Sequence, residues 1–369
     1  MNRTDDAIEL LKRLIAIPSP SREEDGTAAL IYDWLHERGA DVRRFHNNVW
    51  AVAPGFDPAR PTLMLNSHHD TVKPSAQYTR DPYKPEITDG KLYGLGSNDA
   101  GASAVCLLSA FLALADERLP FNLMVAITAA EEVMGEYGMR AFLPEIKRLG
   151  FGPDMVIVGE PTGFQPAVAE RGLVVLDGRT EGVAGHAARN EGVNALYRAI
   201  DDIGILRTFR FPTESALLGP VKINVTQIEA GSQHNVVPAE CRFVVDVRTT
   251  DAYTNAETAR ILQEAVRWSV LTPRSTRVQA SVIEDSHPLA RAAVGMGLTP
   301  FVSPTTSDMA LMHDIPSMKI GPGQSSRSHT ADEYVLIDEI AEAIEKYPLL
   351  IRNIEWKQNS GARASSPTK

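Results

Sequence analysis

Short, almost wholly apolar runs alternate with stretches of helical periodicity along the first 160 residues. The apolar runs cover residues 49–53, 62–66, 122–128 and 154–158. Apolar residues recur at helical spacing in the stretches 5–15, 21–39 and 102–115. Continuous apolar runs are typical of strands that are covered on both faces by helices. The pattern therefore predicts an α/β domain.

Two helix starts carry recognisable capping residues. Thr4 is positioned to cap the first helix, which Pro18 and Pro20 would end. The sequence Ser21-Arg22-Glu23-Glu24 has the spacing of a capping box, so we expect it to begin the second helix. The polar, proline-rich segment 73–91 is expected to be a loop.

From about residue 173 the order changes to strand, helix, strand, strand, helix, strand. The predicted strands are 173–181, 221–229, 240–248 and 277–283, and the predicted helices are 194–206 and 255–271. Thr254 and Glu257 form a capping box for the second of these helices. This order is that of a ferredoxin-like α+β fold, and we expect it to be an inserted domain.

The α/β pattern then returns, with a helix that begins at His287, a strand at 317–320 and a helix at 336–356. The polar segment 357–369 is expected to be a disordered tail. The predicted division is an α/β domain made of 1–172 and 285–356, with an insert at 173–284.

The composition excludes several classes of partner. The formal net charge of -10 makes binding to nucleic acid or to an anionic membrane unfavourable, so we expect a small-molecule partner. The first apolar stretch is broken by Lys12 and Arg13, unlike a signal peptide, and no run is expected to cross a membrane. We therefore expect a cytoplasmic protein. Cys106 and Cys241 stand alone in apolar segments and are expected to be core residues.

Polar residues that can bind a metal stand where the apolar runs end or in the glycine-containing turn before the helix at 102–115. They are His68, Asp99, Glu131 with Glu132, Glu160 and, after the strand at 317–320, His329. In open α/β sheets, sites form beyond the carboxyl ends of the strands. Bringing adjacent carboxylates together there is costly without a cation. The recurrence of the pattern indicates a metal site, in which Asp70 could orient His68.

The glycines at 94, 96 and 101 precede a helix and could instead cradle a phosphate. Their spacing matches neither common phosphate-binding motif, and Asp99 would place a negative charge beside the phosphate. A cation suits this turn better.

Histidines and carboxylates without cysteine suit a catalytic zinc or cobalt site better than a structural one. The carboxylates exceed what one ion needs, whereas two ions roughly 3.5–4 Å apart, bridged by an aspartate, would use them all. The signatures of single-zinc proteases and of serine hydrolases, H-E-x-x-H and G-x-S-x-G, are absent.

These motifs, in this order, resemble those of the dinuclear-zinc acetylornithine deacetylase / succinyl-diaminopimelate desuccinylase family. The motifs are His68-His69-Asp70, Gly94-Leu95-Gly96-Ser97-Asn98-Asp99, Glu131-Glu132, Gly159-Glu160-Pro161-Thr162, Gly185-His186, Asn235-Val236-Val237-Pro238 and Ser328-His329. The resemblance spans about residues 5 to 355. It implies a zinc-hydrolase-type mixed-sheet α/β catalytic domain, interrupted by a ferredoxin-like lid that forms a homodimer.

The resemblance also implies a role for each matching residue. Asp99 would bridge two divalent ions, zinc or cobalt, with His68 and Glu160 on one ion and Glu132 and His329 on the other. Asp70 would orient His68, and Glu131 would be the general base. In the lid, His186 would polarise the scissile carbonyl, from the partner subunit, while Asn235 and Arg248 would bind the substrate.

Two departures from the family pattern concern the substrate. His69 stands at a position that is usually apolar, and Asn98-Asp99-Ala100-Gly101 lacks a basic residue that the family often places after the bridging aspartate. The short lid and the loop at 321–329 are most similar to acetylornithine deacetylase. We therefore expect hydrolysis of N-acetylornithine, or of a relative such as N-acetylcitrulline or N-succinylornithine, in arginine biosynthesis.

Other functions stay open from the sequence. Within the family, the alternatives are succinyl-diaminopimelate desuccinylase and a dipeptidase or carboxypeptidase. Outside enzymes, the chain could be a zinc-binding relative without catalysis, although such a relative would be free to lose Glu131. A nucleotide-binding protein that uses residues 94–101 is the third class.

Overall fold

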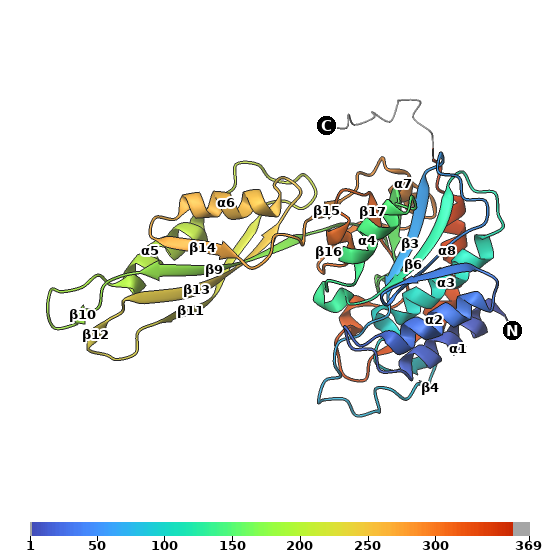
Figure 1. Cartoon of the computed structure of the whole chain (residues 1–369), viewed down its shortest axis with the longest axis horizontal. Coiled ribbons are helices and arrows are strands. Elements are labelled where there is room, and N and C mark those ends of the chain that lie inside the picture. The colour runs from blue at the N-terminus through green and yellow to red at the C-terminus, as the bar shows by residue number, and fades with distance from the viewer. Residues whose placement is uncertain (1, 357–369) are drawn as a thin grey trace.

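The computed structural model describes residues 2–356, which form two bodies joined by extended segments (Figure 1). The larger body, the main domain, is built on a sheet of order β1-β2-β6-β3-β7-β17-β8-β15, and β16 also pairs with β8. Its strands are β1 Asp41–Phe45, β2 Asn48–Val52, β3 Thr62–His68, β6 Asn122–Thr128, β7 Met155–Val158, β8 Ala167–Glu170, β15 Ser281–Val282, β16 Phe301–Ser303 and β17 Ser317–Lys319.

The sheet is mixed. Strand β3 lies between β6 and β7 and is parallel to both, and β17 is parallel to β7. Strands β1, β2 and β15 pair antiparallel with their neighbours. The carboxyl ends of β3, β6 and β7 therefore lie side by side at one edge of the sheet.

Helices cover both faces of the sheet. They are α1 Arg3–Ile15, α2 Asp25–His36, α3 Ala102–Leu114, α4 Met139–Arg148, α7 Pro288–Gly295 and α8 Ile337–Arg352. Leu63 and Leu65 of β3 pack in the core with α1, α3 and α8, whereas Met64, which points the other way, packs in the core with α4. The stretch Ser97–Leu114 has the length and hydropathy of a membrane-spanning helix, but 78% of it is buried inside the main domain, as in a core helix.

The smaller body, the insert (172–273), has the strand order β11-β13-β9-β14 with all neighbours antiparallel. It contains β9 Gly172–Glu181, β10 Gly185–His186, α5 Ala195–Thr208, β11 Lys222–Ala230, β12 Val236–Val237, β13 Glu240–Thr249, α6 Asn255–Ala265 and β14 Ser269–Pro273. In chain order this is 2-3-1-4, the order of a ferredoxin-like sheet. Strands β10 and β12 form a separate ribbon at the end of the insert farthest from the main domain (Figure 1).

The end of the insert differs from the prediction. Helix α6 stops at Ala265, and the fourth strand is β14, not the segment 277–283. The buried carboxylate of Asp202 accepts the backbone N–H groups of Arg267, Trp268 and Ser269 and so holds these residues outside the helix. Residues 281–282 pair instead with β8 in the main sheet.

The capping residues were predicted with mixed success. Thr254 and Glu257 form the predicted capping box, and His287 caps α7. Asn2, not Thr4, caps α1. Ser21 does not cap α2, because its hydroxyl is bonded elsewhere, as described below.

The remaining described elements are a small sheet and four short helical turns. The sheet has the order β18-β5-β4, with β18 Tyr334–Leu336, β5 Lys91–Tyr93 and β4 Glu86–Thr88. The segment 73–91, predicted to be a loop, therefore contains β4 and ends at the first residue of β5. The turns are η1 Ser97–Gly101, η2 Glu131–Val133, η3 Asp308–Leu311 and η4 Ser325–Arg327. The predicted tail at 357–369 lies outside the described residues.

Candidate metal centre

The predicted ligands come from separate segments that meet at the carboxyl edge of the main sheet. His68 is the last residue of β3, and Glu131 and Glu132 begin the turn η2 that follows β6. Glu160 follows β7, and Asp99 lies in η1, immediately before α3. The sequence pattern thus predicted correctly that these strand ends would converge.

His68 lies among three carboxylates. Its Nε2 atom is 3.3 Å from Asp99 Oδ1, 3.7 Å from Glu160 Oε1 and 4.0 Å from Glu131 Oε2. Burial lowers the pKa of His68, but its hydrogen bonds to Asp70 and Asp99 outweigh burial and hold it well above the usual value. The ring is 1% exposed, so its environment is set almost wholly by these acids.

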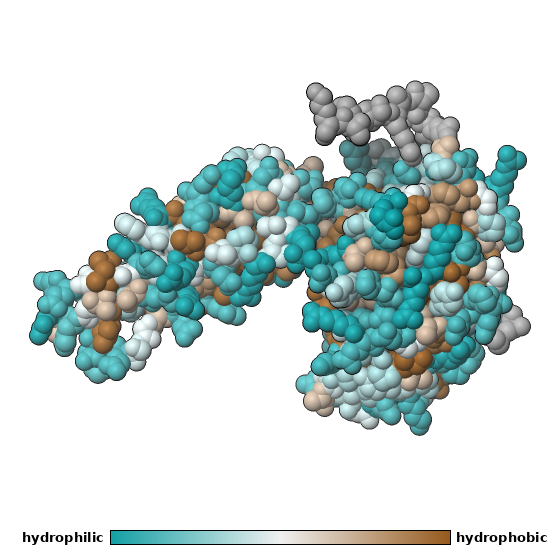
Figure 2. All heavy atoms as spheres, in the orientation of Figure 1, coloured by the Kyte–Doolittle hydropathy of each residue, from teal (hydrophilic) through white to brown (hydrophobic). Residues whose placement is uncertain are grey.

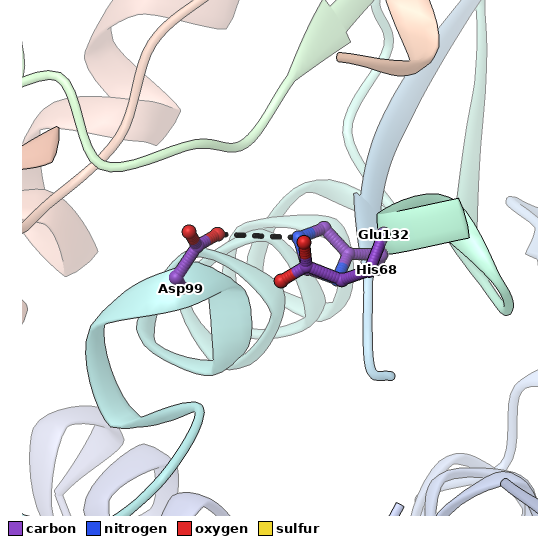
Figure 3. A group of neighbouring side chains, drawn as sticks. All are labelled: His68, Asp99 and Glu132. Atoms are coloured by element: carbon purple, nitrogen blue, oxygen red, sulfur yellow. Dashed lines mark ion pairs between the residues drawn. The ribbon is translucent and has the colours of Figure 1, made fainter. Parts of the chain in front are cut away.

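A second histidine approaches the same aspartate from the other side. The Nε2 atom of His329 is 3.0 Å from Glu132 Oε2 and 3.6 Å from Asp99 Oδ2. The hydrogen bond to Glu132 raises the pKa of His329 to about 9, although burial opposes it. The two oxygens of Asp99 therefore face two different histidines. Figure 3 shows His68, Asp99 and Glu132 pointing toward one another; their ligand atoms all lie within 4.8 Å.

Asp70 lies behind His68 and is fully buried. The Nδ1 atom of His68 donates to the Asp70 carbonyl oxygen at 3.0 Å and lies 3.4 Å from Oδ1. The carboxylate of Asp70 also accepts the backbone N–H groups of Glu131 and Glu132 and the hydroxyl of Ser21. One side chain thus fixes both the ring of His68 and the turn that carries the two glutamates.

Glu131 lines a cleft together with four of the predicted ligands, Asp99, Glu132, Glu160 and His329. Burial raises the pKa of Glu131 well above its ordinary value; His68 opposes the rise, and nearby carboxylates such as Glu160 add to it. Burial likewise raises the pKa of Glu160, to about 8. The cleft has a volume of about 390 Å³, and the part of its wall that other segments form includes Phe301 and Thr305. A small molecule could therefore lie between the carboxylates and this wall.

The donor set fits divalent cations. Two imidazoles and four carboxylates gather at one point, and the pKa of two of these carboxyls is raised because burial penalises their charge. The nitrogen and oxygen donors suit zinc and related ions, and a cation would relieve the repulsion between the acids. His68 is also anchored through Nδ1, as a metal-binding imidazole normally is.

His69, the departure noted in the sequence, points away from this cluster. Its Nδ1 is 2.8 Å from the hydroxyl of Thr27, and its Nε2 is 2.9 Å from the carbonyl oxygen of Asn47. Burial holds the pKa of His69 below its usual value, whereas the pKa of His68 is raised by its acidic neighbours. The residue ties β3 to α2 and to the loop before β2, and it does not touch the ligands.

Two residues that support the site were missed in the sequence. The sequence indicates a helix cap at Ser21, whereas its hydroxyl donates to Asp70, which is 49 residues away in the chain. Glu333 bonds to the turn that carries Asp99, as described below. No local motif marks either residue, because each acts through a contact between segments distant in sequence.

The three insert residues singled out in the sequence lie away from the ligands within this chain. His186 is exposed on the ribbon β10–β12, and its Nδ1 accepts the backbone N–H of Ala188. Asn235 borders the same ribbon, and its carbonyl oxygen accepts the N–H of Ala187. Arg248 lies on β13 and forms an ion pair with Asp246. The chain alone does not bring His186 to the metal cluster (Figure 1).

The fold and the cluster define a metal-dependent hydrolase. The sequence pattern of "Peptidase family M20/M25/M40" matches residues 64–353, and the chain belongs to this family. A succinyl-diaminopimelate desuccinylase of Rhizorhabdus wittichii is 28% identical over 378 residues, which cover 95% of this chain and 98% of the relative. The family resemblance and the mixed α/β fold expected from the sequence are thereby confirmed.

Solved structures of low sequence identity share the fold. The aminopeptidase PepT of Bacillus cereus matches with a TM-score of 0.76 at 19% identity, covering 95% of this chain and 98% of that one. An M20 family metallo-carboxypeptidase of Sulfolobus solfataricus matches with a TM-score of 0.72 at 16% identity, covering 95% and 99%. Together with the family match, the cluster identifies a metal-dependent enzyme that hydrolyses amide bonds.

Proposed function

We propose that the chain removes the acyl group from an N-acyl amino acid with the help of two divalent ions, zinc in the first place. The observation that carries the proposal is the position of Asp99, whose two oxygens face His68 and His329. Such an aspartate is suited to bridge a pair of ions. Glu160 would share one ion with His68, and Glu132 would share the other with His329.

Two ions held by these residues would supply Lewis-acid chemistry, which lowers the pKa of a water molecule and polarises a carbonyl group. Glu131 takes the proton from the attacking water and passes it to the leaving nitrogen. Its buried carboxyl, whose pKa is raised, is suited to hold a proton between these two steps. Asp70 keeps His68 and the turn of Glu131 in place.

The insert would supply the remaining groups. His186 would donate to the oxygen of the scissile carbonyl, and Asn235 and Arg248 would bind the carboxylate of the substrate. Because His186 is exposed at the far end of the insert, we propose that it serves the site of a partner subunit in a homodimer. Val183 and Val236, beside or within the ribbon β10–β12, are 57% and 39% exposed and would favour such a contact. Figure 2 shows hydrophobic side chains at this end of the insert.

For the substrate, we propose N-acetylornithine or a close relative such as N-acetylcitrulline or N-succinylornithine. The name of the similar desuccinylase supports an N-acyl amino acid as the class of substrate and makes N-succinyl-diaminopimelate the second candidate. The cleft of about 390 Å³ is of a size to hold a small molecule.

The test is a panel assay of the released amine. Protein stripped by a chelator and then supplied with zinc, with cobalt or with neither is incubated with the four N-acyl amino acids named above and with an unmodified dipeptide. We expect hydrolysis only with metal, and fastest with an ornithine or citrulline derivative. Equal turnover without metal would contradict the metal assignment. If the diaminopimelate derivative or the dipeptide is hydrolysed fastest, that compound takes the place of N-acetylornithine as the proposed substrate.

A further inference from the structure

Glu333 lies at the point where the two ligand-bearing loops of the site meet. The residue is 2% exposed and follows the loop of His329. Its Oε1 atom accepts the backbone N–H of Asn98 at 2.8 Å and that of Asp99 at 2.9 Å. Its Oε2 atom accepts the N–H of Gly96 at 3.0 Å. One carboxylate therefore holds three amides of the turn that carries Asp99.

Asn98 makes the reciprocal connection. Its Oδ1 atom accepts the N–H of Gln324 at 2.9 Å, and its amide group donates to the carbonyl of Gln324 and to the hydroxyl of Ser328. Gln324 and Ser328 belong to the loop that leads to His329. Six hydrogen bonds from the side chains of Glu333 and Asn98 thus join the Asp99 turn to the His329 loop.

The geometry calls for a carboxylate at this position. The N–H groups of Gly96, Asn98 and Asp99 converge on its two oxygens, and within the turn Asp99 departs from helical geometry, so these N–H groups depend on Glu333 for their acceptor. Burial and the nearby charge of Asp99 raise the pKa of Glu333 to about 8, and the three N–H groups oppose this rise because they favour the charged form. The turn also contains Gly94 and Gly96 with positive φ, a conformation that disfavours other residues.

We propose that Glu333 is a positioning residue that sets the place of Asp99 relative to His329 and so fixes the spacing at which the site binds metal. This inference rests on the proposed metal centre, because Asp99 must be a ligand for its position to matter. Glu333 itself touches neither the ligand carboxylates nor the cleft in the contacts described. Its effect passes through the backbone of Asp99.

The substitution Glu333→Gln tests the proposal with little change in shape. The glutamine oxygen can keep the bonds to Asn98 and Asp99, but an NH₂ group would then face the N–H of Gly96. We expect zinc affinity, measured by competition with a chromophoric chelator, to fall about 10- to 100-fold. The absorption bands of the cobalt-loaded protein should also change. Glu333→Asp keeps the carboxylate on a shorter side chain and should give a smaller loss of zinc affinity. This variant is used for the test if Glu333→Gln does not fold.

Asp202 offers a matched control. Its buried carboxylate also accepts three backbone N–H groups, those of the successive residues Arg267, Trp268 and Ser269. Asp202 lies in the insert, away from the metal centre. Asp202→Asn should lower the midpoint of thermal unfolding and leave zinc affinity within about twofold of the wild type. If Glu333→Gln likewise lowers only the unfolding midpoint, Glu333 is a structural cap and the proposal is wrong.

Asp99→Asn separates this inference from the proposed function. If Asp99→Asn loses zinc affinity and Glu333→Gln does not, the metal centre stands and the role of Glu333 falls. If the wild type takes up no zinc, or Asp99→Asn binds it as the wild type does, the metal centre itself is wrong and both proposals fall.

Discussion

Glu131 lies beside the predicted ligands, but its proposed role is proton transfer. One substitution distinguishes proton transfer from metal binding. Glu131→Gln keeps the size of the side chain and removes the basic oxygen. We expect turnover to fall about 10²- to 10⁴-fold, the usual worth of a positioned proton transfer. Zinc content, measured on the same preparation, should stay at the wild-type value. Normal turnover, or loss of the metal together with activity, would show that Glu131 has another role.

Asp308 is a buried carboxyl that the sequence did not single out. Its Oδ2 accepts the hydroxyl of Thr128 at 2.8 Å, and its Oδ1 has no hydrogen-bond partner among the described residues. Burial raises the pKa of Asp308 from 3.8 to about 6, although the bond from Thr128 opposes the rise. Between these two pKa values the folded protein holds a proton that the unfolded chain releases.

Raising the pH through this window should therefore destabilise the metal-free protein. Asp308→Asn removes the titrating group and keeps an oxygen for Thr128. The stability of the variant relative to the wild type should rise between about pH 4 and 6, by on the order of 3 kcal/mol. Urea unfolding of both chelated proteins across this range measures the difference. A difference that does not change with pH would contradict the assigned cause.

At the scale of single residues, the sequence predicted which side chains converge at the site better than it predicted the residues that hold them in place. His68, Asp99 and Glu132 each stand at the end of an apolar run or in a glycine-rich turn, which is a local pattern. Ser21 and Glu333 act on segments 49 and 234 residues away in the chain. Only the folded chain brings such partners together, so no spacing rule could have found them.

At the scale of elements, the junction of the insert with the main domain is closely packed at Gly172. A Cβ atom there would lie 2.6 Å from backbone atoms of Val278 and Ala280 and would also meet the side chain of Thr249. Backbone cannot yield as a flexible side chain can. Gly172→Ala should therefore destabilise the protein by roughly 1–3 kcal/mol.

Gly204, inside α5, is the matched control, because nothing lies within 4 Å of its added Cβ. Gly204→Ala should stabilise the protein by about 0.5–1 kcal/mol, since alanine loses less freedom in a helix. Urea unfolding of both variants gives the comparison. If the two substitutions change the free energy of unfolding equally, the backbone at the junction adjusts to the added Cβ atom more easily than its contacts indicate.

The elements themselves were predicted where one strong local signal decided them. The strands at 122–128 and 154–158 match β6 and β7 closely because their apolar runs are uninterrupted. The end of α6 was misplaced because Asp202, on α5, holds the following amides. A helix that ends through a distant side chain leaves no mark in its own sequence.

At the scale of the whole molecule, the order of elements predicted an inserted ferredoxin-like unit, and the strand order β11-β13-β9-β14 has that topology. The sequence carries no information on how the insert lies relative to the metal cluster. In the structure the ribbon that bears His186 is at the far end of the insert (Figure 1). A role for His186 therefore requires a second chain or a large movement of the insert.

Mixing two inactive variants distinguishes these possibilities. Chains with Glu131→Gln and chains with His186→Ala should each be nearly inactive, because loss of a donor to the developing oxyanion costs roughly 10²- to 10³-fold. A mixed dimer would contain one site with an intact Glu131 from one chain and an intact His186 from the other. Equal amounts, unfolded and refolded together, should regain up to about one quarter of wild-type activity, since half of the dimers are mixed and half of their sites complete.

Each variant refolded alone is the control, and mixed dimers are quantified by giving the two chains different affinity tags. If mixed dimers form and activity stays at the level of the separate variants, His186 acts within its own chain. The insert would then have to swing until β10 reaches the main domain, and cross-linking the insert in the extended arrangement should abolish turnover even in the wild type. If activity returns in proportion to the mixed dimer, the exposed end of the insert belongs to its partner's catalytic site.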